Sequence, residues 1–127
     1  MIYGVGTDVV EIGRIAAALK RYGERFAQRV LCLSELERFH KHRLPANYLA
    51  KRFAAKEAFS KALGTGIKAP ANWHGVWVRN LASGQPVLEF SEALDALLKK
   101  RGITSAHVSL SDEKGLAFAT VILECEK

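Results

Sequence analysis

Side chains alternate at the start of the chain in a way that predicts a β-strand over residues 2–10. Ile2, Gly4, Gly6 and Asp8 fall on one face of this strand. The other face carries Tyr3, Val5, Thr7 and Val9. Because glycine leaves the backbone bare beside Asp8, a helix or a ligand can approach this face closely.

Residues 11–30 change to the three-and-four spacing of an amphipathic helix, which Gly23 weakens locally. The apolar stripe comprises Ile12, Ile15, Ala16, Leu19, Tyr22 and Phe26. Arg14, Arg21 and Arg25 lie along a different stripe. Surface charges of this kind are commonly just solvated, but the planar guanidinium suits carboxylates and phosphates, which favours a docking face.

Two further helices follow. Ser34 or a neighbour caps a short helix that contains Glu35, and Leu44-Pro45 ends it. A longer helix then begins near Ala46 and continues to Leu63. One ridge of the longer helix consists of alanine alone, which lets another backbone approach closely. It comprises Ala50, Ala54, Ala58 and Ala62.

The neighbouring ridge of this helix carries Phe53, Glu57 and Lys61. Glu57 and Lys61 have the order that favours an i, i+4 ion pair on a protein surface. The flanking residues are alanine and phenylalanine, however, and a carboxylate in apolar surroundings requires a partner. A metal ion would be one such partner, so both interpretations stay open at this point.

Gly64-Thr65-Gly66 ends the long helix, and Gly64 suits a left-handed C-cap. Small residues also let backbone N–H groups reach phosphate oxygens, and Lys61 stands one turn away. In a Walker loop the glycines precede the helix, so the order found here argues against a nucleotide triphosphatase.

The second half of the chain has the pattern of a scaffold. We predict strands at 75–79 and 86–90, a helix from Ser91 to Gly102 with Ala93, Leu94, Leu97 and Leu98 inward, and a hairpin of 105–111 with 116–124 across 112–115. His107, Ser109 and Ser111 share one face of the hairpin. That face is either the solvent side or one that offers His107 to a phosphate or a proton.

Composition limits the class of protein. The chain of 127 residues is 49% hydrophobic and shows no repeat or linker, so we expect a single domain over 1–127. Cys32 and Cys125 are far apart and support neither a disulfide framework nor a zinc site. The sequence has no signal-peptide pattern and no apolar run of roughly 20 residues, so we expect a soluble protein of the cytoplasm.

The net charge of +6 is unevenly distributed. Residues 11–56 hold eleven Lys and Arg against four Glu, a net charge of +7. This asymmetry indicates an anionic partner, either nucleic acid, a phosphorylated small molecule or an acidic protein. A solvated basic face that aids solubility is the simpler interpretation.

Three segments closely resemble the signature segments of bacterial holo-[acyl-carrier-protein] synthases, the short-chain class of 4′-phosphopantetheinyl transferases. They are GVGTDVVEI at 4–12, RFAAKEAFSKALGTG at 52–66 and HVSLSDEKGLAFATVILE at 107–124. The resemblance spans the whole chain. It implies an α+β fold in which an antiparallel sheet packs with a long helix, and a homotrimer with active sites between subunits.

The activity that the resemblance implies is transfer of 4′-phosphopantetheine from coenzyme A to a serine of apo acyl carrier protein, with release of adenosine 3′,5′-bisphosphate. A hard divalent cation, Mg²⁺, would neutralise the diphosphate. The family's metal ligands correspond to Asp8 and Glu57, and its diphosphate-binding lysine corresponds to Lys61. The base that takes the serine proton is left open between Glu57 and a metal-bound water.

The resemblance also implies contacts for both substrates. The wall of the coenzyme A site corresponds to Gly64, Thr65 and Gly66. Arg52 and His107 match positions near the adenosine 3′-phosphate, with the 40–43 cluster in support. The carrier-protein docking residues correspond to Arg14, Arg21, Arg25 and Phe26, and their charge suits an acidic partner.

One departure from the family pattern is Ser111-Asp112-Glu113, where many relatives carry a Thr-His or Thr-Asp pair.

Two other functions remain as alternatives. The basic first half with Trp73 and Trp77 would suit a nucleic-acid-binding module, although the aromatic residues do not interleave with the basic ones. A non-enzymatic adaptor for acidic proteins would use Arg14, Arg21 and Arg25 but would leave Asp8 and Glu57 without a role. Whether the carrier serves fatty acid biosynthesis or a polyketide pathway is not encoded in these motifs.

Overall fold

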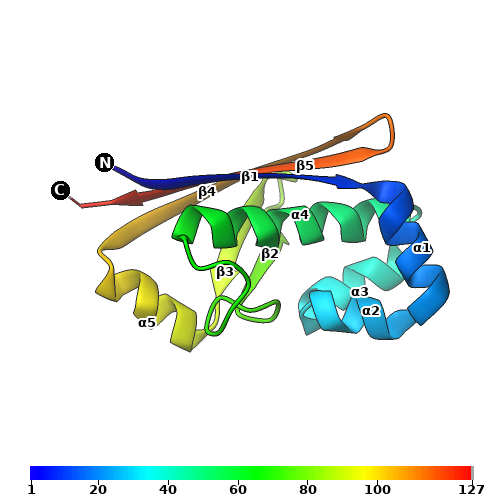
Figure 1. Ribbon diagram of the computed structural model, residues 1–127, viewed down its shortest axis with the longest axis horizontal. Coiled ribbons are helices and arrows are strands. Elements are labelled where there is room, and N and C mark those ends of the chain that lie inside the picture. Colours follow the sequence, from blue (N-terminus) through cyan, green and yellow to red (C-terminus); the bar gives the residue numbers. More distant parts are fainter. Residues whose placement is uncertain (127) are drawn as a thin grey trace.

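The computed structural model describes residues 1–126 and has the predicted α+β architecture. Its elements are β1 (Ile2–Glu11), α1 (Ile12–Tyr22), α2 (Glu24–Val30), α3 (Leu33–Lys41), α4 (Pro45–Leu63), β2 (Val76–Asn80), β3 (Pro86–Phe90), α5 (Glu92–Lys100), β4 (Ile103–Glu113) and β5 (Leu116–Cys125). A three-stranded antiparallel sheet has the order β1-β5-β4, and β2 and β3 form a separate pair. Figure 1 shows α4 running beneath the long sheet, with α1, α2 and α3 at one end and α5 at the other.

β1 and α4 pack backbone against backbone. A Cβ added at Gly4 would overlap the carbonyl oxygen of Ala62, and one added at Gly6 would overlap that of Ala58. The whole alanine ridge is buried: Ala50, Ala54, Ala58 and Ala62. The predicted close approach is therefore confirmed, and it fixes Asp8, two residues beyond Gly6, beside the helix.

Gly23 divides the predicted helix of residues 11–30 into α1 and α2. Its φ of +65° is a value that glycine adopts without penalty, and the chain turns there. The expectation of one continuous helix was therefore wrong, because Gly23 ends the helix instead of only weakening it. Of the predicted apolar stripe, Ile15 is buried, whereas Ala16 and Tyr22 are exposed.

The junctions around α3 also differ from the predicted ones. Cys32 is the N-cap of α3, and its backbone N–H donates to Oε1 of Glu35 over 2.9 Å. Pro45 belongs to the first turn of α4, where its missing N–H does no harm. The leucine-proline pair therefore separates two helices, and its proline opens the second of them.

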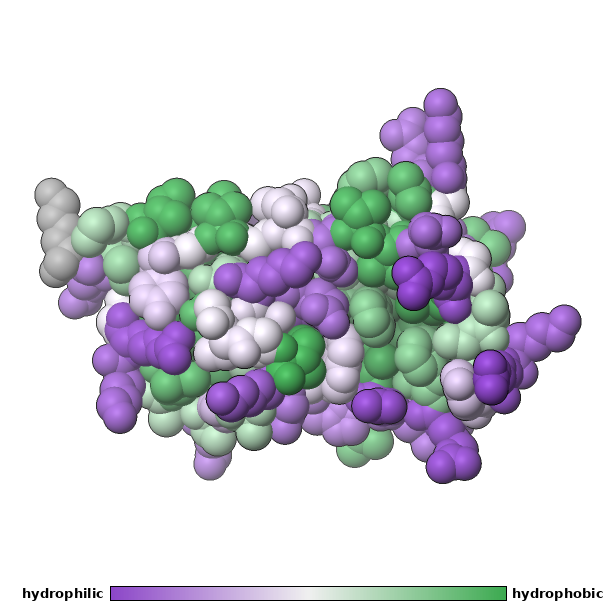
Figure 2. Space-filling view, in the orientation of Figure 1, coloured by the Kyte–Doolittle hydropathy of each residue, from purple (hydrophilic) through white to green (hydrophobic). Residues whose placement is uncertain are grey.

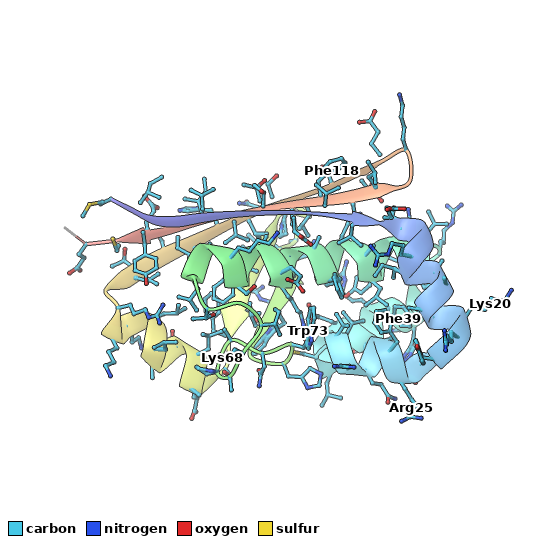
Figure 3. The ribbon with its side chains drawn as sticks, viewed as in Figure 1. Lys20, Arg25, Phe39, Lys68, Trp73 and Phe118 are labelled. Atoms are coloured by element: carbon cyan, nitrogen blue, oxygen red, sulfur yellow. The ribbon has the colours of Figure 1, made fainter. Side chains whose placement is uncertain are left out.

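The β4–β5 hairpin is longer and tighter than predicted. Lys114 and Gly115 form its turn, with φ values of 51° and 79°, so Asp112 and Glu113 belong to β4. His107, Ser109 and Ser111 are exposed on one face, and the other face packs on the core through Ala106, Val108 and Leu110. Figure 3 shows Phe118 projecting from the outer face of the sheet, away from α4.

The scaffold predicted for residues 75–102 is confirmed. The Ser91 hydroxyl accepts a hydrogen bond from the Leu94 N–H over 3.2 Å and so caps α5. α5 buries Leu94 and Leu98, while Ala93, expected inward, is exposed. Over the described residues, none of the helices combines the length and apolar character that a membrane crossing requires.

Candidate active site

Asp8 and Lys61 meet where β1 passes over the C-terminal half of α4. Nζ of Lys61 lies 3.1 Å from Oδ1 of Asp8 and donates to the carbonyl oxygen of Thr7 over 3.0 Å. The lysine side chain is 53% exposed and the aspartate side chain 16% exposed. The partner of Lys61 is therefore Asp8, and the simple surface pair between Glu57 and Lys61 is not formed.

Glu57 lies one turn before Lys61 on α4 and is half-buried. Partial desolvation raises the pKa of its carboxyl, the negative charge of Asp8 raises it further, and Lys61 lowers it. No side chain within residues 1–126 donates a hydrogen bond to this carboxylate or forms an ion pair with it. The Glu57 carboxylate is thus a desolvated acceptor that faces a second carboxylate.

This pair of carboxylates fits a hard divalent cation. Mg²⁺ is bound in proteins through one or two carboxylates, with water and substrate phosphates supplying the other oxygens. A cation between Asp8 and Glu57 would remove the repulsion that raises the pKa of Glu57. Within residues 1–126 no cluster of at least three His, Cys, Asp or Glu side chains forms a ready-made metal cage. The pair therefore suits an ion that also depends on the substrate for ligands.

The segment Gly64–Gly66 follows directly after the helix that carries Glu57 and Lys61. Gly64 is the left-handed C-cap, with a φ of +90°, as predicted. The N–H groups of Gly64, Thr65 and Gly66 all donate to the carbonyl oxygen of Ser60, over 3.0 to 3.3 Å. These amides close the end of α4, and the segment can offer its surface to a ligand.

Arg52 is buried and does not extend towards the Asp8–Glu57 pair. It is 4% exposed, its Nη2 donates to Oδ1 of Asn80 over 2.6 Å, and its guanidinium lies over the Tyr48 ring at 4.2 Å. Its Nε has no hydrogen-bond partner within residues 1–126 and lies 4.0 Å from Oε2 of Glu35. The structure thus gives Arg52 a place in the core beneath β2.

His107 is on the outer face of the long sheet, whereas Asp8 is on the face that packs against α4. Nε2 of His107 is 2.6 Å from Oε1 of Glu124, and this carboxylate also accepts from the Ser105 hydroxyl over 2.8 Å. The two hydrogen bonds lower the pKa of Glu124. One subunit therefore does not bring His107 to its own Asp8 and Glu57.

The predicted docking residues lie together on the arm formed by α1 and α2. Arg14, Arg21 and Arg25 are exposed, and Figure 3 shows Arg25 directed into solvent from this arm. Phe26 is half-buried, with its ring centroid 6.5 Å from that of Phe53. A cavity of about 630 Å³ is lined by Arg21, Tyr22, Arg25, Phe26 and Arg29. A basic rim around an apolar floor suits an acidic partner with an apolar contact.

A second cavity, of about 820 Å³, lies between α3 and the β2–β3 pair. Its walls include Leu31, Leu36 and Trp77. None of the predicted site residues lines it. This cavity is therefore separate from the candidate site at Asp8, Glu57 and Lys61.

Sequence reasoning missed the buried pair of Lys56 and Glu35. Both side chains are 0% exposed, and Nζ of Lys56 lies 2.7 Å from Oε1 of Glu35. A signal for this burial was available, because Lys56 shares the three-and-four spacing of the core residues Leu49, Phe59 and Leu63. The glutamate could not be found this way, since its neighbours in α3 are mostly polar.

Comparisons with known proteins show the family of this chain. The family model of the 4′-phosphopantetheinyl transferase superfamily matches residues 4–121. A holo-[acyl-carrier-protein] synthase of Nitrosomonas europaea is 52% identical, covering 98% of this chain and 99% of that protein. The crystal structure of the Neisseria meningitidis synthase has a TM-score of 0.95 at 44% identity, over 98% of this chain and 99% of that one.

A further solved structure of a relative is a complex with a ligand. The Bacillus anthracis synthase, in complex with CoA (3′,5′-ADP), is 36% identical with a TM-score of 0.83, over 99% of both chains. Fold and sequence thus define one class of protein, an α+β transferase. The chain belongs to the 4′-phosphopantetheinyl transferase superfamily.

Proposed function

We propose that this protein transfers 4′-phosphopantetheine from coenzyme A to a serine hydroxyl of apo acyl carrier protein and releases adenosine 3′,5′-bisphosphate. The observation that carries the proposal is the grouping of Asp8, Glu57 and Lys61, in which the exposed ammonium pairs with Asp8 and both groups act electrostatically on the Glu57 carboxylate. The holo-[acyl-carrier-protein] synthases similar to this chain over nearly its whole length support it.

Mg²⁺ is the cofactor that we propose, with Asp8 and Glu57 as its protein ligands. When bound, the ion would neutralise charge on the diphosphate of coenzyme A. The support is the chemistry of the donor set, which is two hard oxygen anions with no competing Cys or His.

In the transfer step, the serine oxygen attacks the phosphorus that carries the pantetheine arm. A new P–O bond forms to serine, the P–O bond to the departing adenosine 3′,5′-bisphosphate breaks, and the serine proton is released. Lys61, held beside Asp8 with a half-exposed ammonium, stabilises the negative charge that develops on the leaving phosphate. We propose Glu57 as the general base that accepts the serine proton, because its carboxylate is half-buried on α4 one turn before Lys61.

Coenzyme A would lie along the C-terminal end of α4. We propose that Gly64, Thr65 and Gly66 form its wall, because small residues at a helix end leave room for a ligand to approach. His107 would reach the adenosine 3′-phosphate of coenzyme A bound to a neighbouring subunit, since it lies on the outer face of the sheet. Arg52 was also expected near this phosphate, and its burial favours an indirect role through Asn80.

The acidic carrier protein would dock on the α1–α2 arm. Arg14, Arg21 and Arg25 would hold its acidic side chains, and Phe26 would add an apolar contact. Exposed charges of this kind mainly raise the association rate and weaken with salt.

We propose a homotrimer in which the outer faces of three sheets meet. This face exposes large apolar side chains that a monomer would leave in water: Val5, Val9 and Phe118. Figure 2 shows hydrophobic side chains along the edge of the molecule formed by the long sheet. Native mass spectrometry of the purified protein tests this proposal, and a monomer at micromolar concentration would contradict it.

Both cysteines are free thiols, which suits the reducing cytoplasm as the place of action.

The decisive experiment is intact-mass spectrometry of apo acyl carrier protein incubated with the enzyme, coenzyme A and Mg²⁺, with and without a chelator. We expect a metal-dependent gain of about 340 Da, the mass of one phosphopantetheine added at a nucleophilic hydroxyl. No gain, with the carrier protein still bound, would instead indicate an adaptor.

A further inference from the structure

Lys56 forms a three-way contact inside the protein. Its Nζ donates to the carbonyl oxygens of Val30 over 2.6 Å and Trp73 over 2.7 Å, and to Oε1 of Glu35 over 2.7 Å. An ammonium has three donors, so all of them are used. The side chain is 0% exposed and cannot touch either substrate.

Glu35 completes the contact from the other side. Its Oε1 accepts from the Cys32 N–H and its Oε2 from the Val78 N–H, each over 2.9 Å. The Lys56–Glu35 pair therefore connects the middle of α4 to four other segments. These are the end of α2, the start of α3, the segment before β2, and β2 itself. Each of these segments supplies a backbone atom, so a shift of any one would break a buried hydrogen bond.

A buried ion pair is weak support for stability, because desolvation offsets most of the attraction between the charges. Packed apolar side chains of similar size would hold a core at least as well. The pair instead fixes the relative positions of these segments, because one nitrogen holds three acceptors at hydrogen-bond distance.

The helices joined in this way carry residues for the two proposed tasks, docking of the carrier protein and binding of the metal ion. α2 carries Arg25 and Phe26 of the docking face, and α4 carries Glu57, the residue next to Lys56. Aromatic rings connect the two, with centroids 6.5 Å apart for Phe26–Phe53 and 4.9 Å apart for Phe53–Trp73. The Lys56 contact thus links the end of α2 to the middle of α4, the two helices that carry these residues.

We propose that Lys56, with Glu35, is a positioning residue for the transfer step, which rests on the function proposed above. By holding α2 and the Trp73 carbonyl on α4, it keeps the serine of a docked carrier protein in line with the phosphate at Asp8 and Glu57. The docking surface and the coenzyme A contacts themselves do not include Lys56. Its loss should therefore lower kcat while leaving the binding of each substrate nearly unchanged.

The test uses two variants of the full chain. Glu35→Gln/Lys56→Met removes both charges of this contact together, and the buried Arg52, 4.0 Å from Oε2 of Glu35, then keeps only Asn80 and the Tyr48 ring as its neighbours. Lys56→Arg keeps the charge but cannot bring one nitrogen to three acceptors. Leu94→Ala on α5, remote from α2, is the control for lost stability. For each protein we would measure Tm, kcat, KM for coenzyme A and the calorimetric Kd for apo acyl carrier protein, well below Tm.

We expect kcat to fall at least about tenfold in both variants, because misplacement by about 1 Å can lower a rate by much more. KM for coenzyme A and Kd for the carrier should stay within about threefold, and Leu94→Ala should keep the wild-type kcat with a lowered Tm. A folded Lys56 variant with wild-type kcat would overturn the positioning role. Wild-type protein that fails to modify the carrier would overturn the proposed function instead.

Discussion

Two lysines five residues apart on α4 have opposite surroundings. Lys56 is fully buried and has three hydrogen-bond acceptors, whereas Lys61 is half-exposed and holds Asp8 across the gap to β1. The first can act only on the protein, and the second can reach a substrate. One helix thus carries a buried structural lysine on one side and, on another, an exposed lysine for which we propose a role in catalysis, with Glu57 between them in sequence.

The largest effect on turnover is expected at Glu57. Glu57→Gln should lower kcat about 100- to 1,000-fold, because a neutral amide is a poor ligand for a hard cation and a poor base. The raised pKa of Glu57 means that folding disfavours its charge, so stability at pH 7 should not fall. Steady-state kinetics and a thermal melt measure both quantities. Near-normal turnover of the metal-saturated variant would remove Glu57 from the site.

Lys56 should instead dominate stability. Lys56→Met leaves the Glu35 carboxylate buried without its counter-charge, which is expected to lower the free energy of unfolding by about 3–5 kcal/mol. Urea titration followed by circular dichroism measures the loss. A change below about 1 kcal/mol would show that water or a rearranged side chain satisfies Glu35.

Substitution of Lys61 should affect turnover more than the free energy of unfolding. Lys61→Met breaks an ion pair whose lysine is 53% exposed, and such pairs contribute less than about 1 kcal/mol to folding. Turnover should fall about 10- to 100-fold, because the leaving phosphate loses a positive neighbour. If the same urea titration found Lys61→Met as unstable as Lys56→Met, the contrast between the two lysines would be lost.

The sequence predicted those parts of the molecule that depend on local patterns. The bare face around Gly4 and Gly6 and the alanine ridge each predicted a close approach, without naming the partner element, and the structure brings β1 and α4 together there. The resemblance assigned roles to Asp8, Glu57 and Lys61. The sequence could not show which carboxylate pairs with Lys61. Glu57 is only four residues away, but the tertiary structure pairs Lys61 with Asp8, which is 53 residues away.

The misses have the same cause. The partner of Lys56 is Glu35, on the short helix α3, where the apolar spacing of Leu36 and Phe39 indicates a packed face but does not show that a charged residue is buried beside it. The resemblance placed Arg52 near a substrate phosphate, which stays a prediction, but the sequence did not show that Arg52 is buried against Tyr48 and Asn80. Gly23 was recognised as a weak point, but only the packing of Ala27 and Val30 shows that the chain must turn there.

The smallest effect is expected at the docking face, where charges remain in water. Arg14→Glu should raise KM for the carrier protein about tenfold at low salt and leave kcat and KM for coenzyme A unchanged, because an exposed charge affects mainly association. The difference from wild type should shrink as ionic strength rises and the Debye length shortens. Lys99→Glu on α5, an equal charge change remote from α1, is the matched control. If both variants shift KM equally, the basic first half acts only through net charge, and Lys56 would then have no defined docking geometry to preserve.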